Sequence, residues 1–287
     1  MKITIAKSAG FCFGVKRAIK ISLEAAGKEK PLYMLGDIVH NEDVVKSIEK
    51  AGIEKIKNIR GIIPGSLLIR AHGSSKSIFK EADKYRFKII DATCPMVKEI
   101  HKIVIDMDKK GYTIVVIGDP KHDEVLGITG QIRTGAIVLG NHSSIKKLIP
   151  KALAKAAVVV QSTQNLDKVL KMLVAIKKRV KDLKFYNTIC APTRLKQSEI
   201  KAIPLQNGCV IVIGSKNSAN TKRLYEIAKS LNKNSHWVNS AKNIRKGWFK
   251  GVTSVGITAG ASTPDETIKQ IKGYIQKITS SYNMFVA

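Results

Sequence analysis

The amino-acid sequence predicts an α/β protein made of three similar units, each with a small, mainly parallel β-sheet. One observation is the spacing of three cysteines, which are 82 and 96 residues apart: Cys12, Cys94 and Cys190. A second is that three apolar runs end in glycines with the same two separations: Gly36, Gly118 and Gly214. Each glycine follows its cysteine by 24 residues. Two series that share the same uneven spacing indicate three copies of one structural unit.

Within each copy, strand-like and helix-like segments alternate. Short β-type runs precede the cysteines, at residues 1–7, 87–92 and 183–189. Lysine-rich segments with apolar residues at helical spacing follow them, at 15–26, 96–110 and 194–203. The glycine-ended runs predict strands at 32–37, 114–119 and 210–215, and β-branched runs that end in small polar loops predict strands within 67–75, 158–165 and 255–265. This alternation predicts parallel sheets, because parallel strands need crossover connections.

The repeat predicts three α/β domains: residues 1–93 with Cys12, residues 94–189 with Cys94, and residues 190–287 with Cys190. In parallel sheets, ligands bind at the loops that follow the carboxyl ends of the strands. An arrangement of the three units about a pseudo-threefold axis would bring these loops together around a central cavity. We therefore expect the three cysteines to meet at one point.

The chain of 287 residues carries 50 Lys and Arg against 22 Asp and Glu, a formal net charge of +28. This charge favours anionic partners, although solvated lysine-rich helix faces are the simpler explanation for it. No run approaches the roughly 20 apolar residues of a membrane-spanning helix, and the N-terminus does not resemble a signal peptide. We expect a cytoplasmic protein, in which scattered cysteines more often bind metal, catalyse or pack in the core than form disulfides.

Three single cysteines, one per repeat, suit a soft metal or an iron–sulfur cluster. The chain has no closely spaced cysteine pair of the kind found in structural zinc sites. Three thiolates would leave a tetrahedral site or a cubane cluster one ligand short, and catalytic metal sites keep such an open position for substrate. Cys209 lies inside an apolar strand and breaks the spacing, so it is predicted to be a core residue.

Polar residues recur in phase with the cysteines. At offset 28 stand His40, His122 and Ser218, and at offset 30 stand Glu42, Glu124 and Asn220. The third series of strands ends near His72, near Ser162 and Thr163, and near Ser262. The neutral and basic members predict a phosphate or diphosphate pocket, with helix capping as the alternative role for the Ser and Asn side chains. His122 and Glu124 form a titratable pair, in which a carboxyl group away from water could deliver a proton, whereas Glu42 is expected to be a solvated loop carboxylate.

The chain resembles the IspH (LytB) family of 4-hydroxy-3-methylbut-2-enyl diphosphate reductases over almost its whole length. The resemblance rests on nine segments in order: GFCFGVKRAI, LGDIVHNEDVV, IRAHG, DATCPMVKEIH, GDPKHDEVLGITGQ, QSTQN, NTICAPTRLKQ, GSKNSANTKRL and VGITAGASTPD. It implies three α/β domains around a 4Fe-4S cluster whose ligands match Cys12, Cys94 and Cys190. It also implies reductive removal of the substrate's allylic hydroxyl group, in the last step of the methylerythritol phosphate isoprenoid pathway.

The resemblance further implies roles for single residues. Glu124 would deliver the proton beside His122, and Thr163 or Ser162 would contact the hydroxyl end. The diphosphate would be held by His40, His72, Ser218, Asn220 and Ser262. Ala219 stands where many members carry a second serine, and Ala191–Pro192 replaces a common Asp-Ala pair.

An acidic ferredoxin or flavodoxin is the expected electron donor, because the chain has no nucleotide-binding GxGxxG motif or second set of cluster ligands. The alternative function is an iron–sulfur redox sensor or a basic RNA-associated protein that reuses the fold.

Overall fold

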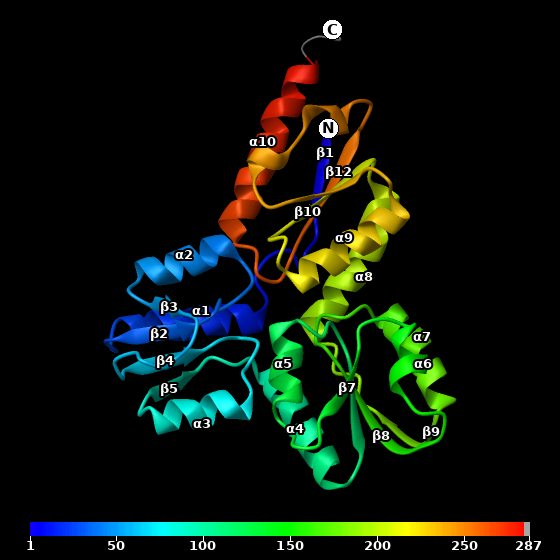
Figure 1. The fold of residues 1–287 in the computed structure, drawn as a ribbon. Helices are drawn as coiled ribbons and strands as arrows, with labels where there is room; N and C mark the ends of the chain where they lie inside the picture. The colour runs from blue at the N-terminus through cyan, green and yellow to red at the C-terminus, as the bar shows by residue number, and fades with distance from the viewer. Residues whose placement is uncertain (284–287) are drawn as a thin grey trace. The chain divides into compact units, whose positions relative to one another are not determined.

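The computed structural model describes residues 1–283 and contains three four-stranded β-sheets (Figure 1). Every pairing between neighbouring strands is parallel. The predicted α/β class with three small parallel sheets is therefore confirmed. The chain forms two compact units. Unit 1 consists of Met1–Phe13, His40–Val44 and the chain from Ala191 onward, and unit 2 of Gly14–Val39 and Val45–Cys190.

Unit 1 contains one sheet and unit 2 contains two. The strands of the unit 1 sheet, in spatial order, are β1 (Lys2–Ile5), β12 (Ser254–Ala259), β10 (Cys209–Ile213) and β11 (Ser235–Val238). The first sheet of unit 2 has the order β3 (Glu54–Ile56), β2 (Leu32–Leu35), β4 (Ser66–Ile69) and β5 (Lys88–Asp91). The second has the order β7 (Ala136–Leu139), β6 (Thr113–Ile117), β8 (Leu153–Val160) and β9 (Val180–Phe185).

Helices connect the strands. They are α1 (Phe13–Ala26), α2 (Glu42–Lys50), α3 (Lys76–Lys84), α4 (Pro95–Lys109), α5 (Asp123–Thr129), α6 (Ser144–Leu148), α7 (Leu166–Lys177), α8 (Ala191–Gln206), α9 (Ala219–Leu231) and α10 (Asp265–Asn283), with short 3₁₀ turns at Ala241–Asn243 and Lys246–Phe249. The three helices predicted after the cysteines are present as α1, α4 and α8, and each begins one to three residues earlier than predicted. Pro95 and Pro192 lie in the first turns of α4 and α8, where proline is tolerated because those N–H groups need no intrahelical partner.

All three sheets share one topology. The strand that precedes a cysteine is an edge strand, at β1, β5 and β9. Each sheet has two central strands. One of them leads into a small polar loop (β12, β4 and β8), and the other is followed by a glycine (β10, β2 and β6). From one central strand the chain continues toward one edge of the sheet, and from the other toward the opposite edge. Open parallel sheets bind ligands at the point between two such strands. The residues predicted for the site follow these strands.

The strand pairing differs from the predicted ranges at the N-terminus. β1 pairs with β12 of unit 1, at Lys2 opposite Ser254 through Ile5 opposite Ile257, and does not join the sheet of residues 32–91. The N-terminal strand therefore completes the sheet built from residues 209–259. The other boundaries of the predicted ranges 1–93, 94–189 and 190–287 stay a prediction.

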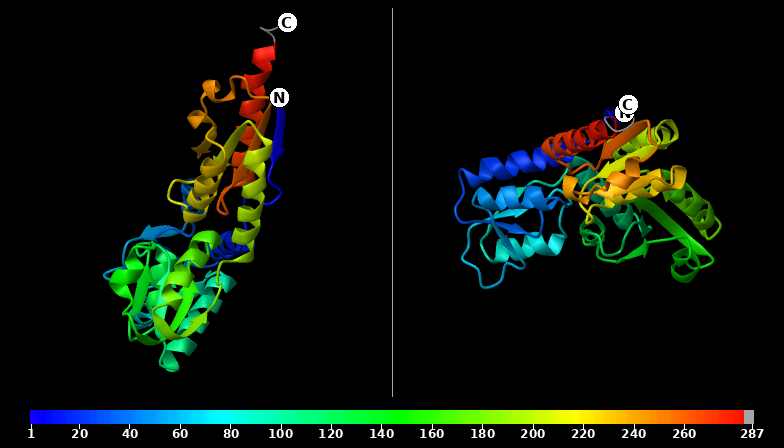
Figure 2. Two further views of the ribbon diagram at one scale, coloured as in Figure 1. Left: turned by 90° about the vertical axis from the view of Figure 1, so that its right-hand side faces the viewer. Right: turned by 90° about the horizontal axis from the view of Figure 1, so that it is seen from above.

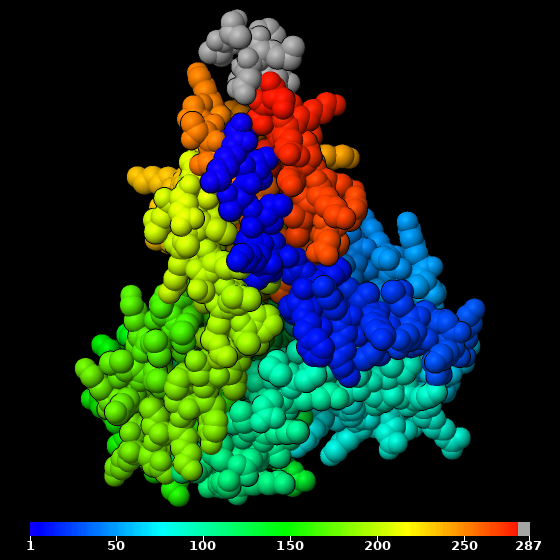
Figure 3. All heavy atoms as spheres, turned by 180° about the vertical axis from the view of Figure 1, so that it is seen from behind, coloured from blue at the N-terminus to red at the C-terminus, as the bar shows by residue number. Residues whose placement is uncertain are grey.

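Apolar side chains alternate between the two faces of each central strand. In β10, Ile211 and Ile213 pack on one face, against Ile271 of α10, whereas Val210 and Val212 pack on the other. Helices α8 and α9 cover that second face through residues that include Ile200, Ile203 and Leu224. Ile3 and Ile5 of β1 join the α10 face, and the views in Figure 2 and Figure 3 show β1 beside α10. This packing fixes the start of the loop that carries Cys12.

In the second sheet of unit 2, the same alternation places α6 and α7 on one face and α4 and α5 on the other. Among residues 1–283, no helix is long and apolar enough to cross a membrane.

Candidate active site

The three predicted cysteine ligands occupy equivalent positions in the three sheets. Each is half-buried, and each lies directly before a helix, with Cys94 as the N-cap of α4. Each backbone N–H donates to the carbonyl oxygen two residues beyond the neighbouring strand: Cys12 to Ala261 (3.1 Å), Cys94 to Ala71 (3.0 Å) and Cys190 to Ser162 (3.1 Å). The backbone therefore presents every cysteine at the carboxyl edge of its sheet. That the three thiols meet at one metal group stays a prediction.

Cys209 is a core residue, as predicted. It is fully buried at the start of β10 and packs in the core on the α10 side of the sheet. Burial raises the pKa of the Cys209 thiol to about 12, because a thiolate would lose its hydration. Cys209 is therefore chemically unlike the three half-buried cysteines.

The loop before Cys12 is held by two side chains of α8 that the sequence interpretation did not single out. The ammonium group of Lys196 is buried, with 2% of the residue exposed, and donates to the carbonyl oxygens of Ser8, Gly10 (3.0 Å) and Ala259 (3.2 Å). Glu199 accepts from the backbone N–H (3.0 Å) and the hydroxyl group (2.5 Å) of Ser8. A buried ammonium requires such acceptors. Lys196 and Glu199 therefore position the loop that presents Cys12.

In unit 2, the carboxyl group of Glu124 is buried, with 1% of the residue exposed. It accepts two hydrogen bonds from Ser162, from the backbone N–H to Oε1 (2.6 Å) and from the hydroxyl group to Oε2 (2.7 Å). Burial raises the pKa of Glu124, and the two hydrogen bonds oppose this only in part. Glu124 thus has the properties predicted for a proton donor, and Ser162 contacts the acid itself.

Two histidines of the predicted site lie together in unit 2. The rings of His72, after β4, and His122, after β6, meet edge to face with 5.5 Å between their centroids. Nδ1 of His122 accepts from the N–H of Glu124 (3.1 Å), so His122 is the N-cap of α5. Arg70 donates to Asp123 (2.7 Å), which joins the same two loops. The loops that follow β4 and β6 therefore form one polar surface.

Thr163 lies in the loop after β8, next to Ser162. Its hydroxyl oxygen accepts from the side-chain amide of Gln161 (3.2 Å). Gln161 is fully buried, and its Oε1 accepts from the N–H of Asp119 (2.9 Å). Gln161 therefore ties the loop of Thr163 to the loop that leads to His122 and Glu124.

In unit 1, the predicted anion ligands Ser218, Asn220 and Ser262 follow β10 and β12, on the loops or in the first helical turn beyond them. Ser218 caps α9, since its hydroxyl oxygen accepts from the N–H of Thr221 (3.3 Å), which is the capping role weighed above. Oδ1 of Asn220 accepts from the N–H of Ala261 (3.2 Å), and the hydroxyl group of Ser262 donates to the carbonyl oxygen of His40 (3.0 Å). These bonds bring three of the loops together. The hydroxyl hydrogen of Ser218 and the amide hydrogens of Asn220 are the donors that suit an anion.

The first repeat differs from the other two at its helix start. Asn41, and not His40, caps α2, because its Oδ1 accepts from the N–H groups of Asp43 and Val44 (both 3.1 Å). The residues NED at the start of a helix are a capping signal that the sequence offered. Glu42 is exposed, as expected for a solvated carboxylate, but it opens α2 and does not lie in a loop. It accepts from Ser215 (2.8 Å) and Asn217 (3.2 Å). It therefore anchors the loop after β10.

The two departures from the family pattern both lie in first helical turns. Ala219 is the first residue of α9, where a methyl side chain offers no hydrogen bond to a ligand. Ala191 and Pro192 open α8 directly after Cys190.

A family model described as LytB protein matches residues 3–276 of the chain. The chain therefore belongs to the LytB family. The resemblance inferred from the nine segments is confirmed.

Relatives of this LytB-family chain are named 4-hydroxy-3-methylbut-2-enyl diphosphate reductase. The protein of Geotalea uraniireducens is 40% identical over 283 residues, which cover 99% of this chain and 100% of the relative. That of Pelobacter propionicus is 39% identical over 278 residues, with 97% and 99% covered. A solved reductase from Plasmodium falciparum matches with a TM-score of 0.88 and 29% identity, over 96% of this chain and 87% of its own. A second solved structure, of the terminal enzyme of the non-mevalonate pathway, matches with a TM-score of 0.69 and 37% identity, with 96% and 100% covered.

Proposed function

We propose that this chain is an oxidoreductase that converts 4-hydroxy-3-methylbut-2-enyl diphosphate to isopentenyl and dimethylallyl diphosphate, the last step of the methylerythritol phosphate pathway. The observation that carries the proposal is the match to reductases of this name over nearly the full length of both chains. The reaction consumes two electrons and two protons and releases the hydroxyl oxygen as water.

Cys12, Cys94 and Cys190 are the proposed ligands of a 4Fe-4S cluster with one open iron. They fit this group because they are half-buried and equivalent in the three sheets, whereas Cys209 is buried in the core. Each lies at the N-terminal end of a helix, whose partial positive charge favours an anionic thiolate ligand. The bound cluster would supply the electrons and a Lewis-acidic iron for the hydroxyl oxygen.

Glu124 is the proposed proton donor. Its buried position raises its pKa and so favours the protonated form of the carboxyl group. Ser162 bonds to both carboxyl oxygens and thereby fixes their orientation. When Oε2 carries the proton, this hydrogen bond reverses, so that Oε2 donates to the hydroxyl oxygen of Ser162, 2.7 Å away. The proton can then pass to that oxygen as the hydroxyl hydrogen moves onward toward the leaving oxygen. His122 and Thr163 complete the proposed surroundings of the hydroxyl end.

The diphosphate group is assigned to donors from the loops at the carboxyl ends of the strands: His40, His72, Ser218, Asn220 and Ser262. Ser218 is the N-cap and Asn220 the second residue of the 13-residue helix α9, whose N-terminal end attracts anions. Glu42, Ser215 and Asn217 hold the preceding loop in place. Because Ala219 offers no side-chain donor, one phosphate contact would come from backbone N–H groups.

Electrons would come from an acidic partner such as a ferredoxin or flavodoxin, and the net charge of +28 would speed that encounter. Lys→Glu changes on the surface that meets the donor should slow donor-dependent turnover and change its salt dependence.

The cysteine assignment is tested with Cys12→Ser, Cys94→Ser and Cys190→Ser, and with Cys209→Ser as the matched control. Each protein is purified anaerobically, its iron and sulfide are measured, and the electron paramagnetic resonance spectrum of the reduced form is recorded with and without substrate. The first three variants should lose the cluster signal, and the control should keep it together with its response to substrate. A full cluster in any of the first three would remove that cysteine from the ligand set.

The acid assignment is tested with Glu124→Gln, and with Glu99→Gln on the exposed face of α4 as the control. Glu124→Gln should retain cluster and substrate binding but reduce kcat by about 100-fold or more, the usual contribution of a positioned acid. Near-normal kcat would assign the proton to another group.

A further inference from the structure

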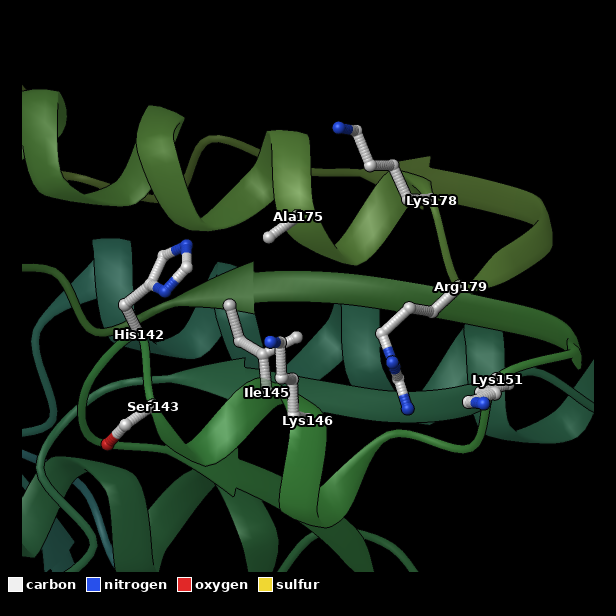
Figure 4. A pocket seen from close by; sticks show the side chains of 8 residues that line it. All are labelled: His142, Ser143, Ile145, Lys146, Lys151, Ala175, Lys178 and Arg179. Carbon is white, nitrogen blue, oxygen red and sulfur yellow. The ribbon is translucent and has the colours of Figure 1, made fainter.

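Unit 2 contains a cavity outside the candidate site, between α6 and α7. It has a volume of about 650 Å³ and is lined by His142, Ser143, Ile145, Lys146, Lys151, Ala175, Lys178 and Arg179 (Figure 4). This volume lies in the range of small-molecule pockets. Ile145 is buried and Ala175 half-buried, so the cavity has an apolar floor between polar walls.

The walls carry four cationic side chains and no carboxylate. In the described part of the chain, none of these four cations forms an ion pair. Figure 4 shows the guanidinium group of Arg179 pointing down into the cavity, with the end of Lys151 near it in this view, and Lys146 rising from α6, whereas Lys178 points away at the rim. Like charges that converge without a counter-charge repel one another, and a bound anion relieves that repulsion.

Arg179 is held in place for this role. Its Nε donates to the carbonyl oxygen of Ile149 (2.8 Å), which leaves the two terminal nitrogens of the guanidinium group for a ligand. A guanidinium fork fixed in this way suits the bidentate recognition of phosphate. The negative end of the dipole of α7 accounts for cations at Lys178 and Arg179, but Lys146 and Lys151 come from other elements and need another explanation.

The position of these cations argues against the electron donor as the occupant. Lys151 and Arg179 precede β8 and β9, whereas Ser162 and Cys190 follow these strands. The eight residues of β8 span about 26 Å at ~3.3 Å per residue. A partner that must reach the cysteines gains nothing from docking at the opposite ends of the strands. A concave, apolar-floored cavity suits a small molecule better than a protein surface.

We propose that this cavity is a second anion site, which binds a small organic phosphate with its phosphate group on Arg179, Lys146 and Lys151 and its apolar part on Ile145 and Ala175. The site is separate from the proposed active site and does not depend on the proposed function. It gives part of the chain's large positive charge a specific role.

The test is a titration of the ¹⁵N-labelled, cluster-loaded full-length protein with butyl phosphate, followed by amide NMR at constant ionic strength. The amide signals of Ser143, Ala175 and Arg179 should shift and saturate, and inorganic phosphate should bind the same residues more weakly because it lacks the apolar part. The double variant Lys146→Gln/Lys151→Gln should bind about tenfold more weakly, as expected for the loss of two exposed charges.

The matched control is Lys147→Gln/Lys171→Gln, which removes the same charge from exposed positions on α6 and α7 outside the cavity. It should retain the affinity of the unmodified protein. Equal weakening in both double variants would show a general charge effect and overturn the proposal, as would shifts that stay linear or are absent at these amides. Because the readout is local to the cavity, its outcome is independent of turnover.

Discussion

Lys196→Met should destabilise the loop that presents Cys12. Methionine nearly matches the length and volume of lysine but cannot donate to the carbonyl oxygens of Ser8, Gly10 and Ala259. A buried acceptor left without its donor costs about 1 kcal/mol or more, so the loss of three such bonds lowers the free energy of unfolding by about 3 kcal/mol. Release of the buried ammonium charge offsets part of this loss, and the apolar replacement limits the cavity.

The assay combines urea unfolding with hydrogen exchange at the amide of Cys12, whose N–H donates to Ala261. A local loss of about 3 kcal/mol would speed that exchange by roughly 100-fold. Arg194→Met is the control, since it removes one positive charge from an exposed position of the same helix and should leave both measurements unchanged. The reasoning would be refuted if the free energy of unfolding of Lys196→Met lay within about 0.5 kcal/mol of the parent's and the Cys12 amide stayed equally protected. Lys196 would then not hold the loop.

Two further predictions concern titratable groups in unit 2, the buried Glu124 and the half-buried His101. Burial raises the pKa of Glu124, so the native state holds its proton above the pH at which the unfolded chain releases it. The stability that this residue contributes is therefore lost as the pH rises above about 4.5. The free energy of unfolding of Glu124→Gln should accordingly rise relative to that of the parent as the pH increases. A difference between the two proteins that stays constant with pH would contradict the raised pKa. Burial lowers the pKa of His101 to about 4, against the smaller effect of Asp91, so protonation of the unfolded chain below pH 6.5 favours unfolding. As the pH falls from 6.5 to 4, His101 should lower the free energy of unfolding by about 3 kcal/mol. In His101→Phe, the free energy of unfolding measured with urea should vary less over this pH range.

The sequence predicted the parts of the fold that repeat along the chain. Strands with the same role in a sheet lie at the same offset from a cysteine, because each unit uses the same order of connections. The glycines show this directly: the N–H groups of Gly36, Gly118 and Gly214 each donate to the last residue of the neighbouring edge strand. The equivalence of the cysteine positions therefore followed from spacing alone.

Strand pairing at the N-terminus did not follow from spacing. A short edge strand can hydrogen-bond to any exposed sheet edge, and the local pattern of β1 does not encode its partner. The pairing with β12 is fixed by packing of Ile3 and Ile5 against a core that includes residues of α10. This packing joins segments about 250 residues apart in sequence, and periodicity carries no information on such a contact.

The role of Lys196 could not be recognised among 50 basic residues, because its burial depends on carbonyl groups that lie up to 188 residues away. Its position nevertheless links two of the cysteines. Lys196 and Glu199 lie on α8, the helix that begins directly after Cys190, and both hold the loop before Cys12. The segment that follows one proposed cluster ligand thus stabilises the segment that presents another. Loosening α8 should therefore expose Cys12 before it affects Cys94, whose loop is tied to Ala71 in unit 2.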